Sequence, residues 1–295
     1  MQTDVGRIKT VLLKHARDAF ADQDRVDAQW QALGYADRPD YEAAIREYEG
    51  FAELLTGFGM QCHYLPPADS TTLDSLYTRD NAIATDGGVI LCSMGKPARQ
   101  VEPVEQLAFY ERSGTGTTIL GQIELPGTVE GGDVTWLTPR ILAVGHGYRT
   151  NAAGIEQLRS LVSDHVEQLV EVPLPHFRGP DDVFHLMSII SPVASDLAVV
   201  YSPLMPVPFR NLLLDLGYRL VEVPEEEFDS LGCNVLAVAP GICVMVQGNP
   251  VTEQRLIDAG AEVHTIRADE ICLKGWGGPT CLTRPLEREG FKVKG

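Results

Sequence analysis

The sequence lacks the features that mark membrane proteins, zinc-knuckle proteins and nucleic-acid-binding proteins. In its 295 residues no apolar run approaches the roughly 20 residues of a membrane-spanning helix. None of the six cysteines form a C-x-x-C pair, so the spacing of a structural zinc site is missing. Basic residues are outnumbered, 24 Lys and Arg against 41 Asp and Glu, and the net charge of −17 repels phosphate backbones and anionic lipids. We therefore expect neither nucleic acid nor membrane as a partner.

The N-terminus also lacks the apolar segment and small-residue cleavage site of a secretory signal. Several cysteines lie in apolar, strand-like runs such as ILCSM and GICVMV, where a thiol is usually a small buried side chain. Free thiols are typical of a reducing compartment. These features predict a cytoplasmic protein. The sequence does not fix the oligomeric state, and a homodimer is compatible with it.

What is present is an ordinary globular composition, with 44% hydrophobic and 22% charged residues. The excess of acid would attract a cationic small molecule, although surface acid also simply keeps a protein soluble. No phosphate loop, dinucleotide fingerprint or defined metal-ligand spacing occurs. We therefore expect no cofactor and no metal.

Short β-branched runs bounded by Gly, Pro, Asp or Asn recur along the chain and predict strands. Helical spacing of apolar residues lies between some of them, and the expected helices cover residues 40–59, 154–170, 208–217 and 251–260. The helix over 40–59 is either a lid or a regular structural element. No linker and no fixed-period repeat interrupts this order, so we predict a single α/β domain over residues 1–295.

The segment LDSLYTRDNA holds two acids, Asp74 and Asp80, six residues apart. If residues 76–78 are extended, both carboxylates share one face, because side chains alternate along a strand. Two carboxylates near one point can bind the N–H donors of a guanidinium, and the alternative is that they cap turns.

The segment VEGGDVTWLTPRILAVGHGYRTN carries Glu130 and Asp133 on either side of two glycines. The glycines would let the backbone bring Glu130 against a ligand, and the alternative is an ordinary Gly-Gly turn. Arg149 follows a strand and precedes a helix, where it either grips a carboxylate or lies on the surface.

Two further residues are candidates for catalysis. His185 stands in the apolar stretch DDVFHLMSIISP, where a histidine is either a catalyst or a satisfied core residue. Cys281 follows the glycine-rich turn KGWGGPT, which would leave its thiol open to a ligand, and the alternative is a buried strand cysteine. Together these residues offer a nucleophile, a histidine, acids for a cation and an arginine for an anion. That set fits an amino acid with a positively charged side chain.

In this combination the sequence resembles the guanidine-modifying superfamily of arginine deiminases, dimethylarginine dimethylaminohydrolases and amidinotransferases. The matching motifs occur in the family's order from about residue 73 to 288, and they are TRD (residues 78–80), EGGD (130–133), RTN (149–151), FHL (184–186), NVLAV (234–238) and GGPTC (277–281). The resemblance implies a five-bladed pseudo-symmetric α/β propeller, or pentein, built from ββαβ modules round a central site.

The resemblance also implies roles. Cys281 would attack the guanidinium carbon, and His185 would protonate the departing amine and then activate water, with Glu130 holding it in place. Asp80 and Asp74 would bind the guanidinium nitrogens. Arg149 would bind the substrate carboxylate.

Further positions bear on the substrate. Asp133, the last residue of EGGD, is assigned to substrate binding as well. The segment KPARQVEP resembles a family segment with tandem arginines, of which only Arg99 is present because Gln100 replaces the other. Deiminases typically carry an aspartate two residues after the histidine, where this chain has Met187, and this favours the dimethylarginine hydrolases. The Arg79–Asp80 pair resembles the deiminases instead.

The predicted function is therefore hydrolysis of a cationic guanidino compound, with N-methylated arginine giving citrulline and an alkylamine through a covalent Cys281 intermediate. The alternatives are deimination of plain arginine or amidino transfer from it. A further alternative, from another class of protein, is a non-catalytic propeller that binds a partner.

Overall fold

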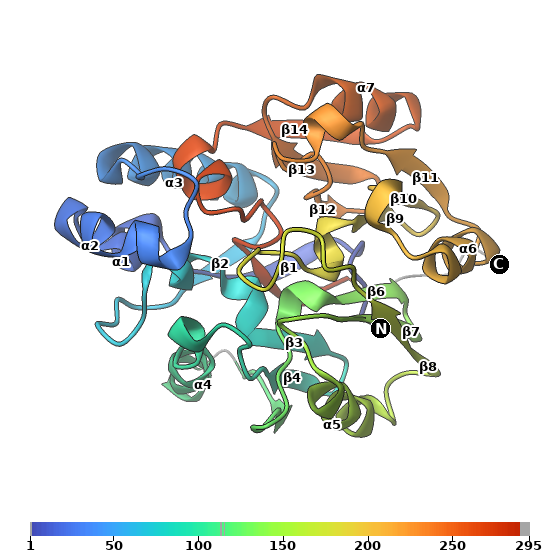
Figure 1. The fold of residues 1–295 in the computed structure, drawn as a ribbon, viewed down its shortest axis with the longest axis horizontal. Coiled ribbons are helices and arrows are strands. Elements are labelled where there is room, and N and C mark those ends of the chain that lie inside the picture. Colours follow the sequence, from blue (N-terminus) through green and yellow to red (C-terminus); the bar gives the residue numbers. More distant parts are fainter. Residues whose placement is uncertain (1, 113, 115, 290–295) are drawn as a thin grey trace.

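The computed structural model describes residues 2–112, 114 and 116–289. Over these residues the strands form five three-stranded sheets. Figure 1 shows the sheets following one another round a common centre, with the longer helices on the outside. The predicted five-bladed α/β propeller is thus confirmed.

Four of the sheets are built from consecutive ββαβ modules. In each module the first strand pairs antiparallel with the second, and the second pairs parallel with the third after a helical crossover. The modules are β3 (Ala82–Thr85), β4 (Gly88–Leu91), α4 (Glu102–Arg112) and β5 (Ile119–Gln122); β6 (Val134–Thr138), β7 (Ile141–His146), α5 (Ala152–Val162) and β8 (Gln168–Pro173); β9 (Ile190–Ala194), β10 (Leu197–Val200), α6 (Val207–Asp215) and β11 (Arg219–Glu222); and β12 (Leu236–Ala239), β13 (Ile242–Val246), α7 (Pro250–Asp258) and β14 (Glu262–Ile266).

The fifth sheet joins the two ends of the chain. Strand β15 (Arg284–Arg288) pairs antiparallel with β1 (Ile8–Leu13), and β1 pairs parallel with β2 (Gln61–Tyr64). Between β1 and β2 lie α1 (Ala16–Phe20), α2 (Gln23–Leu33) and α3 (Tyr41–Gly57). Helix α3 packs on β2 and so takes the place of a crossover helix, which makes it a blade element.

Apolar strands and capped helices explain why these segments fold as they do. Strands β10 and β12 are buried at every position, and their sequences LAVV and LAVA are continuous apolar runs. Helix α3 begins where the Asp40 carboxylate accepts the backbone N–H of Ala43, and α5 begins where the Asn151 side chain accepts that of Gly154.

The helix predicted over residues 154–170 is longer than the helix in the structure. Residues 154–170 were expected to be helical throughout, but α5 ends at Val162 and residues from Gln168 onward form β8. The apolar residues between 166 and 170 fit the periodicity of a helix and that of a strand equally well. This segment is a strand because it pairs parallel with β7, where Leu169 lies opposite Leu142. Strands β2 and β5 have mixed, half-exposed sequences and were not predicted.

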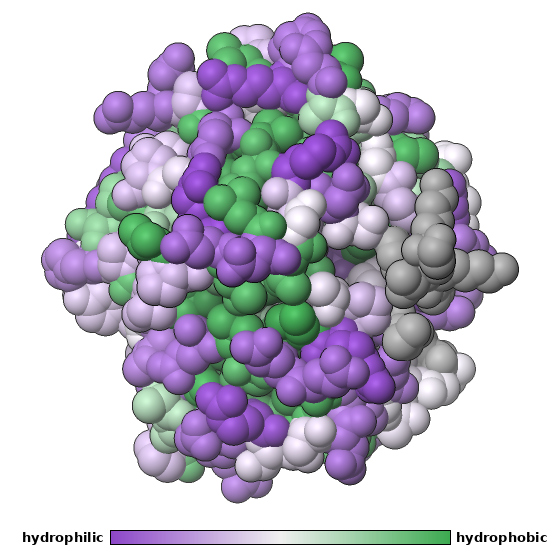
Figure 2. All heavy atoms as spheres, turned by 90° about the vertical axis from the view of Figure 1, so that its right-hand side faces the viewer, coloured by the Kyte–Doolittle hydropathy of each residue, from purple (hydrophilic) through white to green (hydrophobic). Residues whose placement is uncertain are grey.

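Apolar side chains lie among polar ones on one face of the molecule. Figure 2 shows this for the right-hand side of Figure 1, where hydrophobic residues are visible between hydrophilic ones. Helices α6 and α7 expose large apolar side chains, namely Val207, Leu214, Val251 and Ile257. No helix among the described residues is long and apolar enough to span a membrane.

Candidate active site

One polar residue from the loop that leads into the first strand of each blade reaches the centre of the propeller. These residues are Asp80 before β3, Glu130 before β6, His185 before β9, Asn234 before β12 and Cys281 before β15. The intervals between them run from 47 to 55 residues. The pseudo-symmetry of the fold therefore brings together residues that lie far apart in the sequence.

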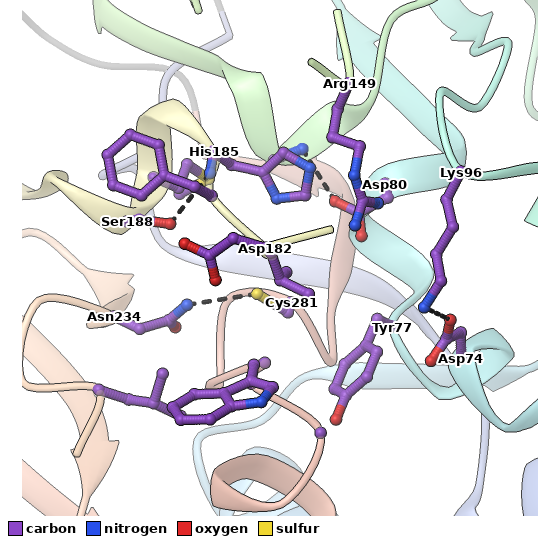
Figure 3. Close-up of a pocket in the computed structure, with 18 of the residues that line it drawn as sticks. Asp74, Tyr77, Asp80, Lys96, Arg149, Asp182, His185, Ser188, Asn234 and Cys281 are labelled. Carbon is purple, nitrogen blue, oxygen red and sulfur yellow. Dashed lines mark hydrogen bonds and ion pairs between the residues drawn. The ribbon is translucent and has the colours of Figure 1, made fainter. Parts of the chain in front are cut away.

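The central residues open onto a pocket with about 950 Å³ of empty space, part of it continuous with solvent. Figure 3 shows His185, Asp182, Asn234 and Cys281 gathered on one side of this pocket and the Lys96–Asp74 pair on the other. Most of the residues predicted from the sequence line it: Asp74, Asp80, Arg99, Arg149, His185 and Cys281. Glu130 and Asp133 lie behind the lining and are fully buried.

Glu130 holds His185. Its Oε2 lies 2.7 Å from Nε2 of His185, and Arg149 Nη1 approaches the same carboxylate at 3.3 Å. Burial alone would lower the pKa of His185, but the Asp133 charge and the hydrogen bond with Glu130 outweigh it and raise this pKa to about 9. Burial would raise the pKa of Glu130, but the hydrogen bond with His185 and the charge of Arg149 hold it well below its usual range. His185 is therefore an imidazolium at neutral pH.

The Cys281 thiol is half-buried and receives a hydrogen bond from Nδ2 of Asn234 at 3.3 Å. The Oδ1 of Asn234 accepts from the Thr280 backbone N–H and hydroxyl, which fixes the orientation of the amide. Burial and the nearby Asp80 charge raise the pKa of the Cys281 thiol, while the hydrogen bond from Asn234 works against this rise. A cationic ligand would favour the thiolate.

Two glycines allow the backbone to pack closely against these groups. A Cβ on Gly132 would lie 2.7 Å from Nδ1 of His185 and 2.8 Å from Oδ1 of Asp80. A Cβ on Gly278 would lie 2.4 Å from the side chain of Asn234. Both distances are shorter than atoms tolerate, so the EGGD and GGPTC motifs need glycine at these positions.

Asp80 is held rigidly from two sides. Its Oδ1 accepts the Gly132 backbone N–H at 2.9 Å, and its Oδ2 pairs with Nη1 of Arg99 at 2.6 Å. Nε and Nη2 of Arg99 donate to Glu102, and Nη2 also donates to the Tyr77 carbonyl oxygen. Arg99 was expected to bind substrate, and it does line the pocket, but most of its N–H donors are engaged within the protein.

Asp74 lies on the far side of the pocket and pairs with Lys96, whose Nζ is 2.6 Å from Oδ2. The condition that residues 76–78 are extended is not met, because Leu73–Leu76 and Thr78–Asn81 form two 3₁₀ turns. The turns still direct both carboxylates into the pocket.

Asp133 does not contact the pocket. Its Oδ2 accepts the Thr150 hydroxyl at 2.6 Å and its Oδ1 accepts the Leu186 backbone N–H at 2.9 Å. The expected substrate contact is thus replaced by a structural role, in which Asp133 fixes the backbone beside His185. Burial raises the pKa of Asp133 to about 6.

Three polar residues of the site were not singled out from the sequence. Asn234 was noted only as part of the NVLAV motif, although its place before β12 matches that of the other central residues. Lys96 and Asp182 lie in polar loops, where a charged residue carries no signal. The Asp182 carboxylate lines the pocket and accepts no hydrogen bond from another side chain of the described residues.

Asp80, Glu130 and His185 each offer a ligand atom within 4.8 Å of the others, as a metal site would require. The Asp80 and Glu130 carboxylates are already neutralised by Arg99 and Arg149, and His185 Nε2 is bonded to Glu130. This pairing with cations reduces the attraction for a metal ion.

The chain is similar in sequence to known arginine deiminases. The family model described as arginine deiminase matches residues 72–213 and 209–288. The arginine deiminase of Mycobacterium avium is 30% identical over 72% of this chain, and the chain spans about 60% of the length of that curated relative.

Solved structures share the fold. A dimethylarginine dimethylaminohydrolase from Pseudomonas aeruginosa, complexed with citrulline, superposes with a TM-score of 0.75 at 22% identity, covering 94% of this chain and 98% of that one. SxtG, an amidinotransferase of saxitoxin biosynthesis from Microseira wollei, gives a TM-score of 0.78 at 14% identity, covering 100% of this chain and 98% of that one. The match to the family model shows that the chain belongs to the arginine deiminase family.

Proposed function

We propose that this protein is a cysteine hydrolase that cleaves a C–N bond of a substituted guanidine, with N-methylated arginine as its substrate. The observation that carries the proposal is that the Cys281 thiol and the Glu130-bound His185 imidazolium belong to one centre, beside the Asp80 carboxylate. A guanidinium held by Asp80 would bring its carbon to the thiol and would favour the thiolate by its own charge.

The chemistry follows from these groups. The Cys281 thiolate forms a bond to the guanidinium carbon, and a protonated His185 gives a proton to the departing amine as its C–N bond breaks. A water molecule then attacks the same carbon, His185 takes its proton, and the C–S bond breaks to restore the cysteine. The products are a urea derivative, which is citrulline for an arginine substrate, and an amine.

Met187 supports a methylated substrate. It is 4% exposed and lines the pocket two residues after His185. A thioether offers an apolar, adaptable surface to an N-methyl group and no acceptor for an N–H donor. The leaving group would then be methylamine or dimethylamine.

A second candidate, deimination of plain arginine to citrulline and ammonia, is favoured by Asp182. This carboxylate faces the pocket on the same side as Cys281 and could accept N–H donors of an unsubstituted guanidinium. The match to the arginine deiminase family model supports this candidate as well. Amidino transfer would require an amine acceptor in place of water.

Mass spectrometry of the products tests both candidates. The protein is incubated with an equimolar mixture of arginine, monomethylarginine and asymmetric dimethylarginine, and a Cys281→Ser variant serves as the control. Loss of the methylated arginines with formation of citrulline and methylamines is the expected result. Loss of arginine alone would support the deiminase candidate, and no loss of any guanidine would contradict the proposed function.

A further inference from the structure

A second cavity lies apart from the candidate active site. Its described lining comes from segments in or next to β1, β3, β6 and β15, and it holds about 270 Å³ of space, part of it continuous with solvent. The 3₁₀ turn Thr78–Asn81 serves both cavities, because its Asp80 lines the active-site pocket whereas its Arg79 lines this second cavity. We call it the arginine cavity, after Arg79 and Arg284 in its wall.

Positive charge exceeds negative charge around the arginine cavity. Arg79 and Arg284 are 2% and 5% exposed, and the charges of both act on the equally buried Arg288. Burial lowers the pKa of Arg284 to about 10 and that of Arg288 to about 9, so both remain charged at neutral pH. Asp4 is the only carboxylate among the described residues of the lining. Three guanidinium groups are therefore accompanied by one carboxylate.

The Asp4 carboxylate is used by groups of the protein. Its Oδ1 accepts from Nη2 of Arg79 at 2.9 Å. Its Oδ2 accepts the Thr135 hydroxyl at 3.0 Å and the Trp136 backbone N–H at 2.7 Å. Asp4 thus forms an ion pair with Arg79 and leaves the charge of Arg284 without a partner of its own.

The three arginines keep donors for which the described residues supply no acceptor. The Nε atoms of Arg79, Arg284 and Arg288 are buried and have no hydrogen-bond partner there. Nη1 of Arg288 donates to the carbonyl oxygens of Gly6 and Ala237, at 2.6 and 2.9 Å. A buried charge without a partner is costly, so an acceptor that enters the cavity from solvent would be bound favourably.

We propose that the arginine cavity is a binding site for a small inorganic monoanion such as chloride, held between Arg79 and Arg284. An anion offers acceptors to the buried N–H donors and compensates the charge that Asp4 leaves unbalanced. The space suits a small ion, because it is about 270 Å³ against about 950 Å³ in the active-site pocket. A divalent oxyanion such as sulfate is larger and costs more free energy to remove from water. The proposal is independent of the proposed function.

Chloride at this position would join segments that are distant in the sequence. Arg79 precedes β3, Arg284 begins β15, and Asp4 precedes β1 and is bonded to Trp136 of β6. A ligand that binds only the folded state raises the free energy of unfolding by mass action. We therefore expect chloride to stabilise the protein against heat.

Thermal unfolding of the full chain tests the proposal. Tm is measured at constant ionic strength while sodium chloride replaces sodium gluconate, whose anion is much larger than chloride. Tm should rise by about 2–4 °C once the chloride concentration reaches roughly ten times its Kd. In Arg284→Met this response should disappear, because the variant lacks the buried guanidinium whose Nε has no acceptor.

Arg25 provides a matched control. Its Nε is also buried without an acceptor among the described residues, and its Nη2 donates to the Thr71 carbonyl oxygen, but it does not line the arginine cavity. Arg25→Met should keep the full response of Tm to chloride.

Bromide locates the anion without relying on a variant that folds. Crystals of the unmodified protein grown in sodium bromide should give an anomalous-scattering peak between Arg79 and Arg284. The absence of that peak would overturn the proposal, and so would an equal response of Tm to chloride in Arg284→Met, which would indicate a general salt effect. A response to sulfate that exceeds the response to chloride and is lost in Arg284→Met would overturn the choice of a monoanion.

Discussion

The two sides of the pocket differ in how far their hydrogen-bonding groups are satisfied. On the reaction side, Glu130 is bonded to His185 and Asn234 is bonded to both Cys281 and Thr280. On the recognition side, Lys96 donates to Asp74 and to the Leu33 carbonyl oxygen and has one N–H donor to spare. The reaction side is thus already assembled, whereas the recognition side keeps groups free for a ligand.

This difference in hydrogen bonding shows which part of the site has its geometry set by the fold. The reaction side is built from the loops that enter the first strand of each blade, so the pseudo-symmetry of the propeller sets its geometry. The recognition side includes the turn of Lys96, which lies within a module, between β4 and α4. We expect changes on the reaction side to abolish turnover and changes on the recognition side to alter the choice of substrate.

The largest effect is expected for the nucleophile. Cys281→Ser should reduce turnover by about 10⁴-fold or more, because the hydroxyl cannot replace the thiolate in forming the covalent intermediate. Cys62→Ser is the matched control, since Cys62 is also a half-buried free thiol but does not line the pocket. Substantial activity in the Cys281 variant would contradict the proposed reaction.

The next effect concerns the proton on His185. His185→Gln should reduce turnover by about 10²- to 10⁴-fold, as is typical for the loss of a general acid and base. In the unmodified enzyme, kcat/KM should fall as the pH rises through about 9, where His185 loses the proton that the leaving amine requires.

The substitution Glu130→Gln predicts the direction in which the alkaline limb of the pH profile should move. The Glu130 carboxylate raises the pKa of His185, so removing its charge should move the alkaline limb of the kcat/KM profile to lower pH. A pH profile measured between about pH 6 and 10 in both proteins makes the comparison. An unmoved limb would show that another group controls it.

A smaller effect should separate the two candidate substrates. Asp182→Asn should reduce kcat/KM for plain arginine by about tenfold and affect dimethylarginine less, because only the unsubstituted guanidinium offers the additional N–H donors. The neighbouring Asp181→Asn is the control, since Asp181 is exposed and outside the pocket lining. Equal losses for both substrates would mean that Asp182 acts on something other than the guanidinium.

The smallest effect concerns the resting thiol. Because burial raises the pKa of Cys281, chloroacetamide should alkylate it slowly at pH 7 and faster as the pH rises. The isosteric cation chloroacetamidine should react at least about tenfold faster at pH 7, since its charge favours the thiolate. Mass spectrometry of the labelled peptide measures both rates, and equal rates would argue against cation-assisted activation.

Much of this arrangement is predictable from the sequence. The apolar runs of β10 and β12, the glycines of EGGD and GGPTC, and the motif order identify the fold and the central residues. The glycines are informative because close packing forbids a side chain there, as at Gly132 and Gly278.

What the sequence does not reveal is which partners the charged residues find. Arg99 and Asp133 fit a family pattern equally well whether they face a ligand or the protein, and only the fold brings Glu102 and Thr150 against them. The 3₁₀ turns around Asp74 were missed for a similar reason, since short turns depend on tertiary contacts more than on the local pattern of residues.

The pairing of β1 with β15 has a consequence for when the protein becomes active. Cys281 lies just before β15, and the partner of β15 is the first strand of the described chain. During synthesis β1 emerges early and keeps an unpaired edge until the last blade arrives, and contacts between such distant segments form late in folding. A nascent chain therefore carries its histidine and acids before its thiol is in place, so that a partly made protein would lack the proposed nucleophile.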